Sequence, residues 1–489
     1  MPTAFLFIFL TDRVFTLKEP KYTFLFIASA AVLLLILAFT LSGTADSGDS
    51  VMHYLYARYV FNHPDNFYNA WAKPLFVLLA SPFAQLGFTG IKVFNIINTI
   101  VAMVAAYLTA KKLNLANSWL VSVLLFLAPM NFALSLSGLT EPLFACLLIT
   151  GLCLLLYNYS VTGLIILSFL PFVRSEGMFL LMIIAAYLVW QKKYSGILWL
   201  CTGQLLYAIA GYFHFGTLLW FYQSNPYSLF SKYGSGALLT YFLAMPIITG
   251  PASCFLLAVA VICLPLKFIK NIRKDNTIRP LILFWTLFIA YFSFHVTAWK
   301  FGLFGSFGMA RIISAVSPLM IILCVYGYNH AETFMQNKLS KVYALLKHPV
   351  LLVLAINLIY MAVKFSGHIG EPGFDFTPGT DELLESKMAD YIKQKYPDYR
   401  NRQVFYGAPY LSLALDIDPT GFQNPMRQTD IGKFPSKSLY VWDDWYSVVE
   451  GGISNESLLQ NMSFTKDTSF SQKGGRPLKL RTVALFVKK

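Results

Sequence analysis

Apolar runs, each about as long as a helix that crosses a bilayer, recur along the first three quarters of this chain. A transmembrane helix needs about 20 mainly apolar residues. Polar residues, among them Arg174 and Glu176, divide the stretch 160–191 into two shorter runs, which predicts a helical hairpin with a polar tip. Together with nine further runs the sequence predicts eleven crossings; the nine lie at 22–41, 91–110, 119–136, 143–157, 197–215, 252–266, 281–296, 312–328 and 349–363.

The composition agrees with a membrane protein and excludes a nucleic-acid-binding one. Hydrophobic residues make up 56% of the chain and charged residues only 13%, whereas a soluble domain has about 45–50% and 25%. A net charge of +14 would indicate nucleic acid only if it formed a basic face on a soluble domain. Much of the Lys and Arg instead flanks apolar runs, as the positive-inside rule predicts for cytoplasmic loops. We expect a cytoplasmic N-terminus, contact with membrane lipids, and no nucleic-acid partner.

Two parts follow from this pattern. Residues 1–363 are predicted to form an all-α polytopic transmembrane domain with a long first external loop at 42–90 and a second external region at 216–250. Residues 364–489 change in character: a helix is predicted at 381–395, and strand-like runs lie at 403–406, 439–442 and 481–487. With eleven crossings this tail is a small extracytoplasmic α/β domain.

Two carboxylates, Asp46 and Asp49, follow the first apolar run directly. Charges near a bilayer are energetically expensive, so acids at the external end of a helix are candidates for function. A carboxylate there can act as a general base that takes the proton of an attacking hydroxyl. The alternative is that one of these acids only caps the helix that follows.

Several motifs recur in an order and spacing that resembles a known family. The acid at Asp49 is followed by an aromatic-rich segment and then by Lys73-Pro74-Leu75, while Ser50 stands where a second acid is frequent. Together with three later segments this arrangement resembles the GT-C glycosyltransferases, in particular the branch of protein mannosyltransferases and lipid A aminoarabinose transferases. The three segments are Thr140-Glu141-Pro142-Leu143, Arg174-Ser175-Glu176-Gly177, and Arg311 before Pro318-Leu319.

The resemblance implies a membrane glycosyltransferase. It would move a sugar, mannose by family frequency, from a polyprenyl-phosphate-linked donor to an acceptor hydroxyl of a glycan, lipid or protein on the extracytoplasmic side. Asp49 would be the general base and Asp46 a second candidate. Cations at the external face would stabilise the leaving phosphate, and the candidates are Lys73, Arg174, Lys300 and Arg311, with His53, Glu141 and Glu176 in support. No histidine or cysteine spacing indicates a metal site, so we expect no divalent metal.

Purely structural roles remain as alternatives for individual residues. Arg174 would form an ion pair with Glu141 or Glu176, Lys300 would extend toward the interface beside Trp299, and His53 would be an ordinary polar group at a water-facing mouth. In the tail, the acids within Trp442-Asp443-Asp444-Trp445-Tyr446 indicate a carbohydrate-contacting surface.

Two other functions compete with the glycosyltransferase. A transporter or flippase of lipid-linked glycans would share broken helices and buried cations, but it predicts inverted repeats, which this sequence lacks. A glycan polymerase or ligase would place its catalytic residues in a large late external loop, whereas the acids here cluster in the first loop.

Overall fold

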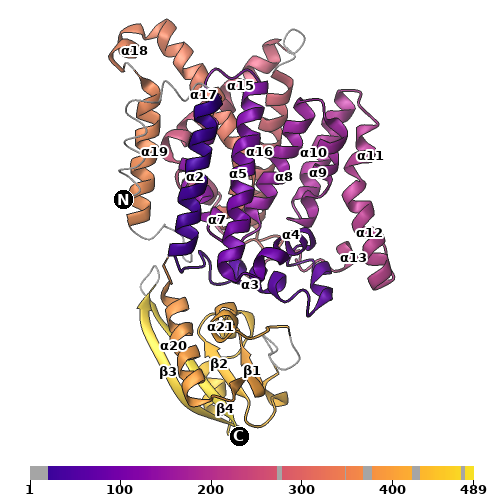
Figure 1. Cartoon of the computed structure of the whole chain (residues 1–489), viewed down its shortest axis with the longest axis vertical. Coiled ribbons are helices and arrows are strands. Elements are labelled where there is room, and N and C mark those ends of the chain that lie inside the picture. The colour runs from indigo at the N-terminus through magenta and orange to yellow at the C-terminus, as the bar shows by residue number, and fades with distance from the viewer. Residues whose placement is uncertain (1–19, 272–277, 347, 367–376, 421–429, 475–478) are drawn as a thin grey trace.

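The computed structural model of the chain describes residues 20–271, 278–346, 348–366, 377–420, 430–474 and 479–489. A bundle of helices forms one end of the molecule, and a small domain with a four-stranded sheet forms the other (Figure 1). The helical body and the mixed C-terminal domain are therefore both present. The segment that carries the predicted cytoplasmic N-terminus, 1–19, lies outside the described residues.

Long apolar helices identify an integral membrane protein. Five stretches among the described residues are long and apolar enough to cross a bilayer. They are α2 (Pro20–Thr40), α5 (Phe88–Lys112), α15 (Pro251–Asn271), α16 (Ile278–Phe301), and the 3₁₀ helix η4 (Ala310–Val316) continued by α17 (Ser317–Lys338).

The remaining apolar runs form shorter helices, and proline accounts for one of the breaks. The run 119–136 is divided at Pro129, because the residue before a proline is pushed out of the helical region, and Ala128 has ψ of 111°. The stretch 160–191 forms a hairpin with a polar tip at 173–176, as predicted. The shorter helices are α6 (Trp119–Leu127), α7 (Pro129–Ser135), α8 (Glu141–Leu156), α9 (Ser160–Ser168), η3 (Leu170–Phe172), α10 (Gly177–Trp190), α11 (Gly196–Leu200), α12 (Thr202–Phe215), α18 (Ser340–Leu346) and α19 (Pro349–Ser366).

The two predicted external regions are folded onto the bundle. The first contains α3 (Asp49–Arg58), η2 (Pro64–Tyr68) and α4 (Pro74–Ala84), and α3 lies at the end of the bundle that faces the C-terminal domain (Figure 1). The second contains α13 (Trp220–Gln223) and α14 (Thr240–Thr249). Because α14 packs against α7 and η4, this region includes a short helix held inside the bundle.

The C-terminal domain is a sheet with strand order β1-β2-β4-β3, in which β1 and β2 are parallel and the other pairs antiparallel. The predicted helix and three predicted strands coincide with α20, β1, β2 and β4, whereas β3 was not predicted. The elements are α20 (Thr380–Lys395), η5 (Tyr399–Asn401), β1 (Val404–Tyr406), α21 (Pro409–Leu415), η6 (Ile431–Lys433), β2 (Leu439–Asp443), the π-helical turn η7 (Tyr446–Glu450), α22 (Asn455–Gln460), β3 (Phe464–Gly474) and β4 (Lys479–Lys488).

Both faces of this sheet are covered by apolar side chains. Helices α20 and α21 close one face, where Met388 and Leu411 pack on Val441. On the other face Trp442 and Phe486 belong to a second cluster. Successive residues of a strand point to opposite faces of the sheet. Because both faces are covered here, every residue of β2 is buried. The domain thus has a hydrophobic core separate from that of the bundle.

Candidate active site

The loop between α2 and α3 is held in one shape by its own polar groups. The Asp46 carboxylate accepts hydrogen bonds from the backbone N–H groups of Gly48 (2.9 Å) and Ser50 (3.3 Å). The Ser50 hydroxyl donates to the Thr44 carbonyl at 2.8 Å and accepts from the Gly138 N–H at 2.7 Å. Asp46 therefore satisfies the amino end of α3, where N–H groups lack partners within the helix, and Asp49 stands as the first residue of that helix.

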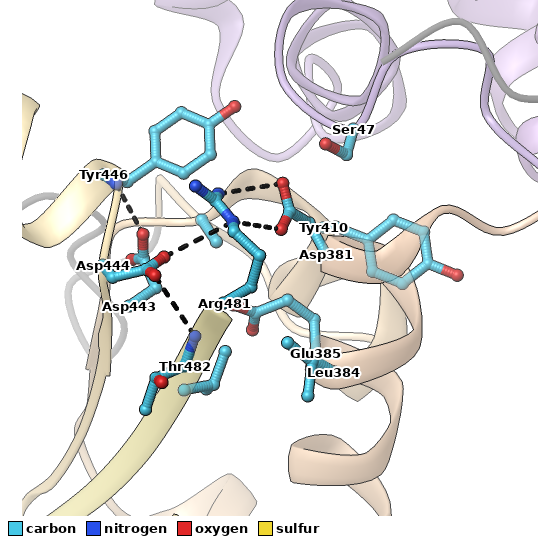
Figure 2. A pocket seen from close by; sticks show the side chains of 12 residues that line it. Ser47, Asp381, Leu384, Glu385, Tyr410, Asp443, Asp444, Tyr446, Arg481 and Thr482 are labelled. Carbon is cyan, nitrogen blue, oxygen red and sulfur yellow. Dashed lines mark hydrogen bonds and ion pairs between the residues drawn. The ribbon is translucent and has the colours of Figure 1, made fainter. Parts of the chain in front are cut away.

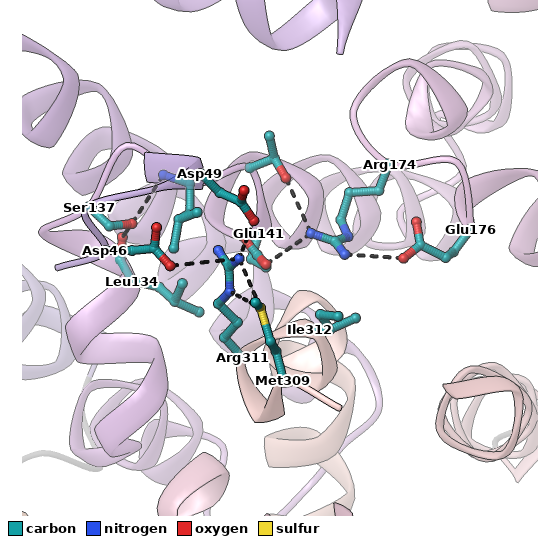
Figure 3. A network of polar contacts seen from close by, with 12 residues as sticks. Asp46, Asp49, Leu134, Ser137, Glu141, Arg174, Glu176, Met309, Arg311 and Ile312 are labelled. Atoms are coloured by element: carbon teal, nitrogen blue, oxygen red, sulfur yellow. Dashed lines mark hydrogen bonds and ion pairs between the residues drawn. The ribbon is translucent and has the colours of Figure 1, made fainter. Parts of the chain in front are cut away.

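Arg311 joins both acids although it lies far away in the sequence. Its Nη2 is 2.5 Å from Asp49 Oδ2 and 3.8 Å from Asp46 Oδ2 (Figure 3). The guanidinium is almost fully buried, and the thioether of Met309 contacts it at 3.1 Å. Burial raises the pKa of Asp46 above its ordinary value, although the Arg311 charge opposes this rise. The structure thus brings together the two candidate acids and one candidate cation.

A second ion-pair group surrounds Arg174 at the hairpin tip. Its guanidinium is 2.9 Å from Glu141 Oε1 and 3.1 Å from Glu176 Oε1, and it donates to the Thr140 hydroxyl at 3.3 Å. Both ion pairs considered as the alternative for Arg174 are therefore present. Glu141 lies between the two guanidinium groups of Arg174 and Arg311 (Figure 3), so the two groups form one polar layer.

Lys73 is the candidate cation without a carboxylate partner in this layer. It is buried, at 5% exposure, and its Nζ donates to the Ser175 hydroxyl at 3.1 Å and lies 4.8 Å from the ring centroid of Tyr227. Within the part of the chain that the structure describes, no acid lies within ion-pair distance of it. Lys73 also has a positive φ of 70° at the start of α4, a backbone conformation that non-glycine residues adopt only when their surroundings hold them there.

Lys300 lies apart from this layer, whereas His53 is buried beside it. Lys300 is exposed in the last turn of α16, and it makes no ion pair with any residue of the described ranges, so the structure does not bring it to the acids. The expectation that His53 faces water is wrong: its ring is buried, stacks on Trp71 at 4.9 Å, and contacts the Ala72 carbonyl through Nδ1 at 3.2 Å. Burial lowers the pKa of His53 to about 3, so its neutral ring donates to Ala72 and fixes the first loop.

The acidic cluster of the tail also differs from its prediction. Trp442 is buried, and its indole N–H donates to the Ile453 carbonyl at 2.9 Å. Asp443 is buried as well and accepts hydrogen bonds from the backbone N–H groups of Trp445 and Ser447. The interpretation as a carbohydrate-contacting surface is wrong for Trp442, which belongs to an apolar cluster of the domain. It stays a prediction for Asp443, Asp444 and Tyr446, which line a small pocket beside the first loop (Figure 2).

Sequence reasoning missed how the C-terminal domain holds the acidic loop. Glu382 of α20 accepts hydrogen bonds from the backbone N–H and the hydroxyl of Thr44. The Tyr446 hydroxyl lies so close to Gly48 that a Cβ at this position would collide with it. Two more contacts, Arg58–Asp416 (3.2 Å) and His63–Asp418 (2.7 Å), join the first loop to the domain. No local sequence signal marks these pairs, which are more than 330 residues apart.

No group of three or more His, Cys, Asp or Glu side chains among the described residues is arranged to hold a metal ion. The candidate site is a layer of carboxylates and cations that joins the start of α3 to η4, to the start of α8 and to the tip of the hairpin.

Comparison with known proteins identifies the architecture. A scan against protein families and a search of curated proteins find no match. Among solved structures, ArnT from Cupriavidus metallidurans bound to undecaprenyl phosphate superposes with a TM-score of 0.60 at 12% identity, over 95% of this chain and 98% of that chain. The Archaeoglobus fulgidus oligosaccharyltransferase tethered with an acceptor peptide superposes with a TM-score of 0.54 at 12% identity, over 89% of this chain and 70% of that chain. The chain has the GT-C fold. The resemblance inferred from the motifs is confirmed for the fold, and the GT-C match to ArnT includes the C-terminal domain, since nearly the whole chain is covered.

Proposed function

We propose that this GT-C protein is a membrane glycosyltransferase that moves a sugar from a polyprenyl-phosphate-linked donor to an acceptor hydroxyl on the extracytoplasmic side. The observation that carries this proposal is the contact of Asp49 with Arg311, which joins the first loop to the start of a late apolar helix. A donor of this class is supported by the ArnT structure of the same fold, which is bound to undecaprenyl phosphate.

Asp49 is the general base in this proposal. The acceptor oxygen attacks the anomeric carbon of the sugar while its proton passes to the Asp49 carboxylate. The bond between the anomeric carbon and the phosphate oxygen breaks, and its electron pair stays on the lipid phosphate. Arg311 Nη2 contacts Asp49 Oδ2 at 2.5 Å and orients this carboxylate. Asp46 holds the loop through Gly48 and Ser50 and is the second candidate.

Lys73 is the best candidate for binding the leaving phosphate. The guanidinium groups of Arg174 and Arg311 already face carboxylates, whereas the buried ammonium of Lys73 has a hydroxyl and an aromatic ring as its contacts. A buried charge is costly without a close partner, and a phosphate would add a direct counter-charge to that of Glu176, which acts on Lys73 only from beyond ion-pair distance. Arg174, the neighbour of Ser175 in the sequence, would help Lys73 to bind the leaving phosphate. Lys300, which is exposed at the end of α16, would act only at the edge of the site.

The architecture completes the proposal. Residues 1–363 would form the catalytic transmembrane domain with eleven crossings and a cytoplasmic N-terminus, and residues 364–489 would lie outside the membrane over the first loop. The contacts of Glu382 and Tyr446 with that loop support a domain that steadies the catalytic residues and borders the acceptor. Mannose is a modest preference that rests on family frequency.

One assay tests this function. The purified chain in detergent is incubated with polyprenyl phosphates that carry mannose, glucose or an amino sugar, together with glycan, lipid and peptide acceptors, and free lipid phosphate is measured. We expect release with one donor, and release that is about 10²–10⁴-fold slower when Asp49 is replaced by Asn. A flippase would move the donor across a membrane without cleaving it, so transport without release would contradict the proposal.

A further inference from the structure

Two short segments, 229–231 and 302–304, pair with each other next to the carboxyl end of α16. The Phe304 N–H donates to the Leu229 carbonyl at 3.0 Å, and an antiparallel β-bridge forms at Phe230. Both segments direct apolar side chains outward: Phe230 is 71% exposed, Leu229 58% and Phe304 46%. These paired segments thus present an aromatic and aliphatic surface although they lie outside the long apolar helices.

This surface continues the surface of the bundle that faces lipid. Phe301 is the last residue of α16, which is long and apolar enough to cross a bilayer, and its side chain is exposed. On the neighbouring helix α14, Phe242 packs on Phe292 of α16 with 4.9 Å between ring centroids, and Phe242 and Leu243 are exposed. A membrane-crossing helix meets lipid wherever protein does not cover it, so the paired segments border a face that lipid surrounds.

The C-terminal domain reaches the same surface through η7. The carboxylate of Glu450, the last residue of η7, accepts a hydrogen bond from the Tyr233 hydroxyl at 2.7 Å and forms an ion pair with Lys232. The ring of Trp445 packs against that of Phe307, with 6.2 Å between centroids. Because Lys232 and Tyr233 directly follow the first of the paired segments, these contacts hold η7 beside them.

Two consecutive apolar side chains of η7 are left exposed in this position. Val448 is 40% exposed and Val449 42%. The backbone of the turn is paired internally: the Val449 N–H donates to the Trp445 carbonyl at 2.7 Å, and the Gly452 N–H donates to the Val448 carbonyl at 3.0 Å. Internal pairing of this kind lowers the cost of placing a turn in an apolar environment. The turn therefore suits contact with lipid in both its side chains and its backbone.

We propose that η7 and the paired segments form one surface that lies in the interfacial layer of the bilayer, with phospholipids as its partner. Exposed apolar side chains that gather in one patch mark a site of interaction, and this patch adjoins a face of the bundle that lipid surrounds. Lys232 and Glu450 lie between its two halves, as charged groups accompany apolar ones on segments that rest in an interface. The C-terminal domain thus touches the membrane through Val448 and Val449, in addition to its contacts with the bundle.

Lipid contact needs neither a sugar donor nor turnover, so this inference goes beyond the proposed function and is tested separately from it. The full chain is placed in nanodiscs of phosphatidylcholine and phosphatidylglycerol and is photo-crosslinked in two variants, Val449→p-benzoylphenylalanine and Phe230→p-benzoylphenylalanine. Gln394→p-benzoylphenylalanine, at an exposed position of α20 in the same domain, is the matched control. Mass spectrometry should find phospholipid adducts in the first two variants and none in the control.

Three results would overturn the proposal. A phospholipid adduct at Phe230 without one at Val449 would place the C-terminal domain off the membrane. Crosslinks from both positions to a second copy of the chain would identify another occupant, and adducts of equal yield at Gln394 would show that the lipid contact is not confined to this surface. Val448→p-benzoylphenylalanine supplies a second position in η7, so the question is decided even if the Val449 variant does not fold, and thermal unfolding of each preparation is the folding control.

Discussion

Replacing Asp49 with asparagine removes the proposed proton acceptor and preserves the size of the side chain. General base catalysis contributes about 10²–10⁴-fold to a rate, which corresponds to about 3–5 kcal/mol of transition-state stabilisation. We therefore expect Asp49→Asn to lose two to four orders of magnitude in the release of lipid phosphate, about the whole contribution of the base.

The same substitution should affect stability far less. Asp49 is 43% exposed on its side chain, and Asp46 still faces Arg311 at 3.8 Å. Breaking a fully buried ion pair costs about 3–5 kcal/mol, but an exposed pair contributes only about 0–1 kcal/mol. Because the pair is partly exposed and the second acid remains, we expect a loss near the lower figure, about 1 kcal/mol. The expected fall in activity is therefore too large to be explained by the expected loss of stability.

The assay is a time course of lipid phosphate release, with thermal unfolding of the same preparations as the folding control. Asp65→Asn is the matched control, since Asp65 lies in the same loop and is 83% exposed on its side chain. Its one ion pair among the described residues is with His214 at 3.2 Å, and the variant should keep normal activity. Near-normal turnover of Asp49→Asn with loss in Asp46→Asn would refute the assignment and exchange the two roles. Normal turnover of both would remove the catalytic centre from this loop.

Four further outcomes are expected. Lys73→Met should fold and raise the KM for the donor, since it removes a buried cation that has no ion-pair partner among the described residues. Unchanged donor kinetics would contradict the assignment. Arg311→Lys keeps the charge but loses the planar fork, so activity should fall while the thermal midpoint changes little. Cysteines introduced at Ser195 and Ser436 should react with a membrane-impermeant reagent from opposite sides, and labelling of both from one side of intact cells would exclude the topology. Burial raises the pKa of Asp443 to about 6, above its value in the unfolded chain. The folded domain therefore binds more protons than the unfolded chain, and its stability should fall as the pH rises from about 4 to 6. Hydrogen exchange of β2 in the wild type and in Asp443→Asn measures this effect, and an equal pH dependence in both would argue against it.

Features set by local sequence were accessible to prediction. Apolar length located the long helices, and polar residues such as Arg174 and Glu176 located the tip of the hairpin. Short runs rich in β-branched and aromatic residues located β2 and β4. Strand β3 was missed because Phe464–Gly474 is largely polar and forms the edge of the sheet, where pairing with β4 rather than burial defines it.

Contacts between distant segments were not accessible in the same way. The motifs placed Asp49 and Arg311 on the same side of the membrane, but only the packing of η4 against the first loop makes them an ion pair. The burial of His53 and Asp443 depends likewise on neighbours that no local pattern reveals. The ion pairs of Arg174 could be anticipated, because Glu176 is two residues away and Glu141 opens the adjacent helix α8.

The contacts between the first loop and the C-terminal domain bear on how this protein can be recombined. Each contact has one half in the first loop and the other in the C-terminal domain: Thr44 with Glu382, and Gly48 with Tyr446. A chimera that takes its C-terminal domain from another GT-C protein would replace one half of every pair and leave the first loop, with the proposed base Asp49, without its support. The C-terminal domain therefore cannot be exchanged alone, and chimeras should recover activity only when residues 42–63 come from the same protein as the C-terminal domain.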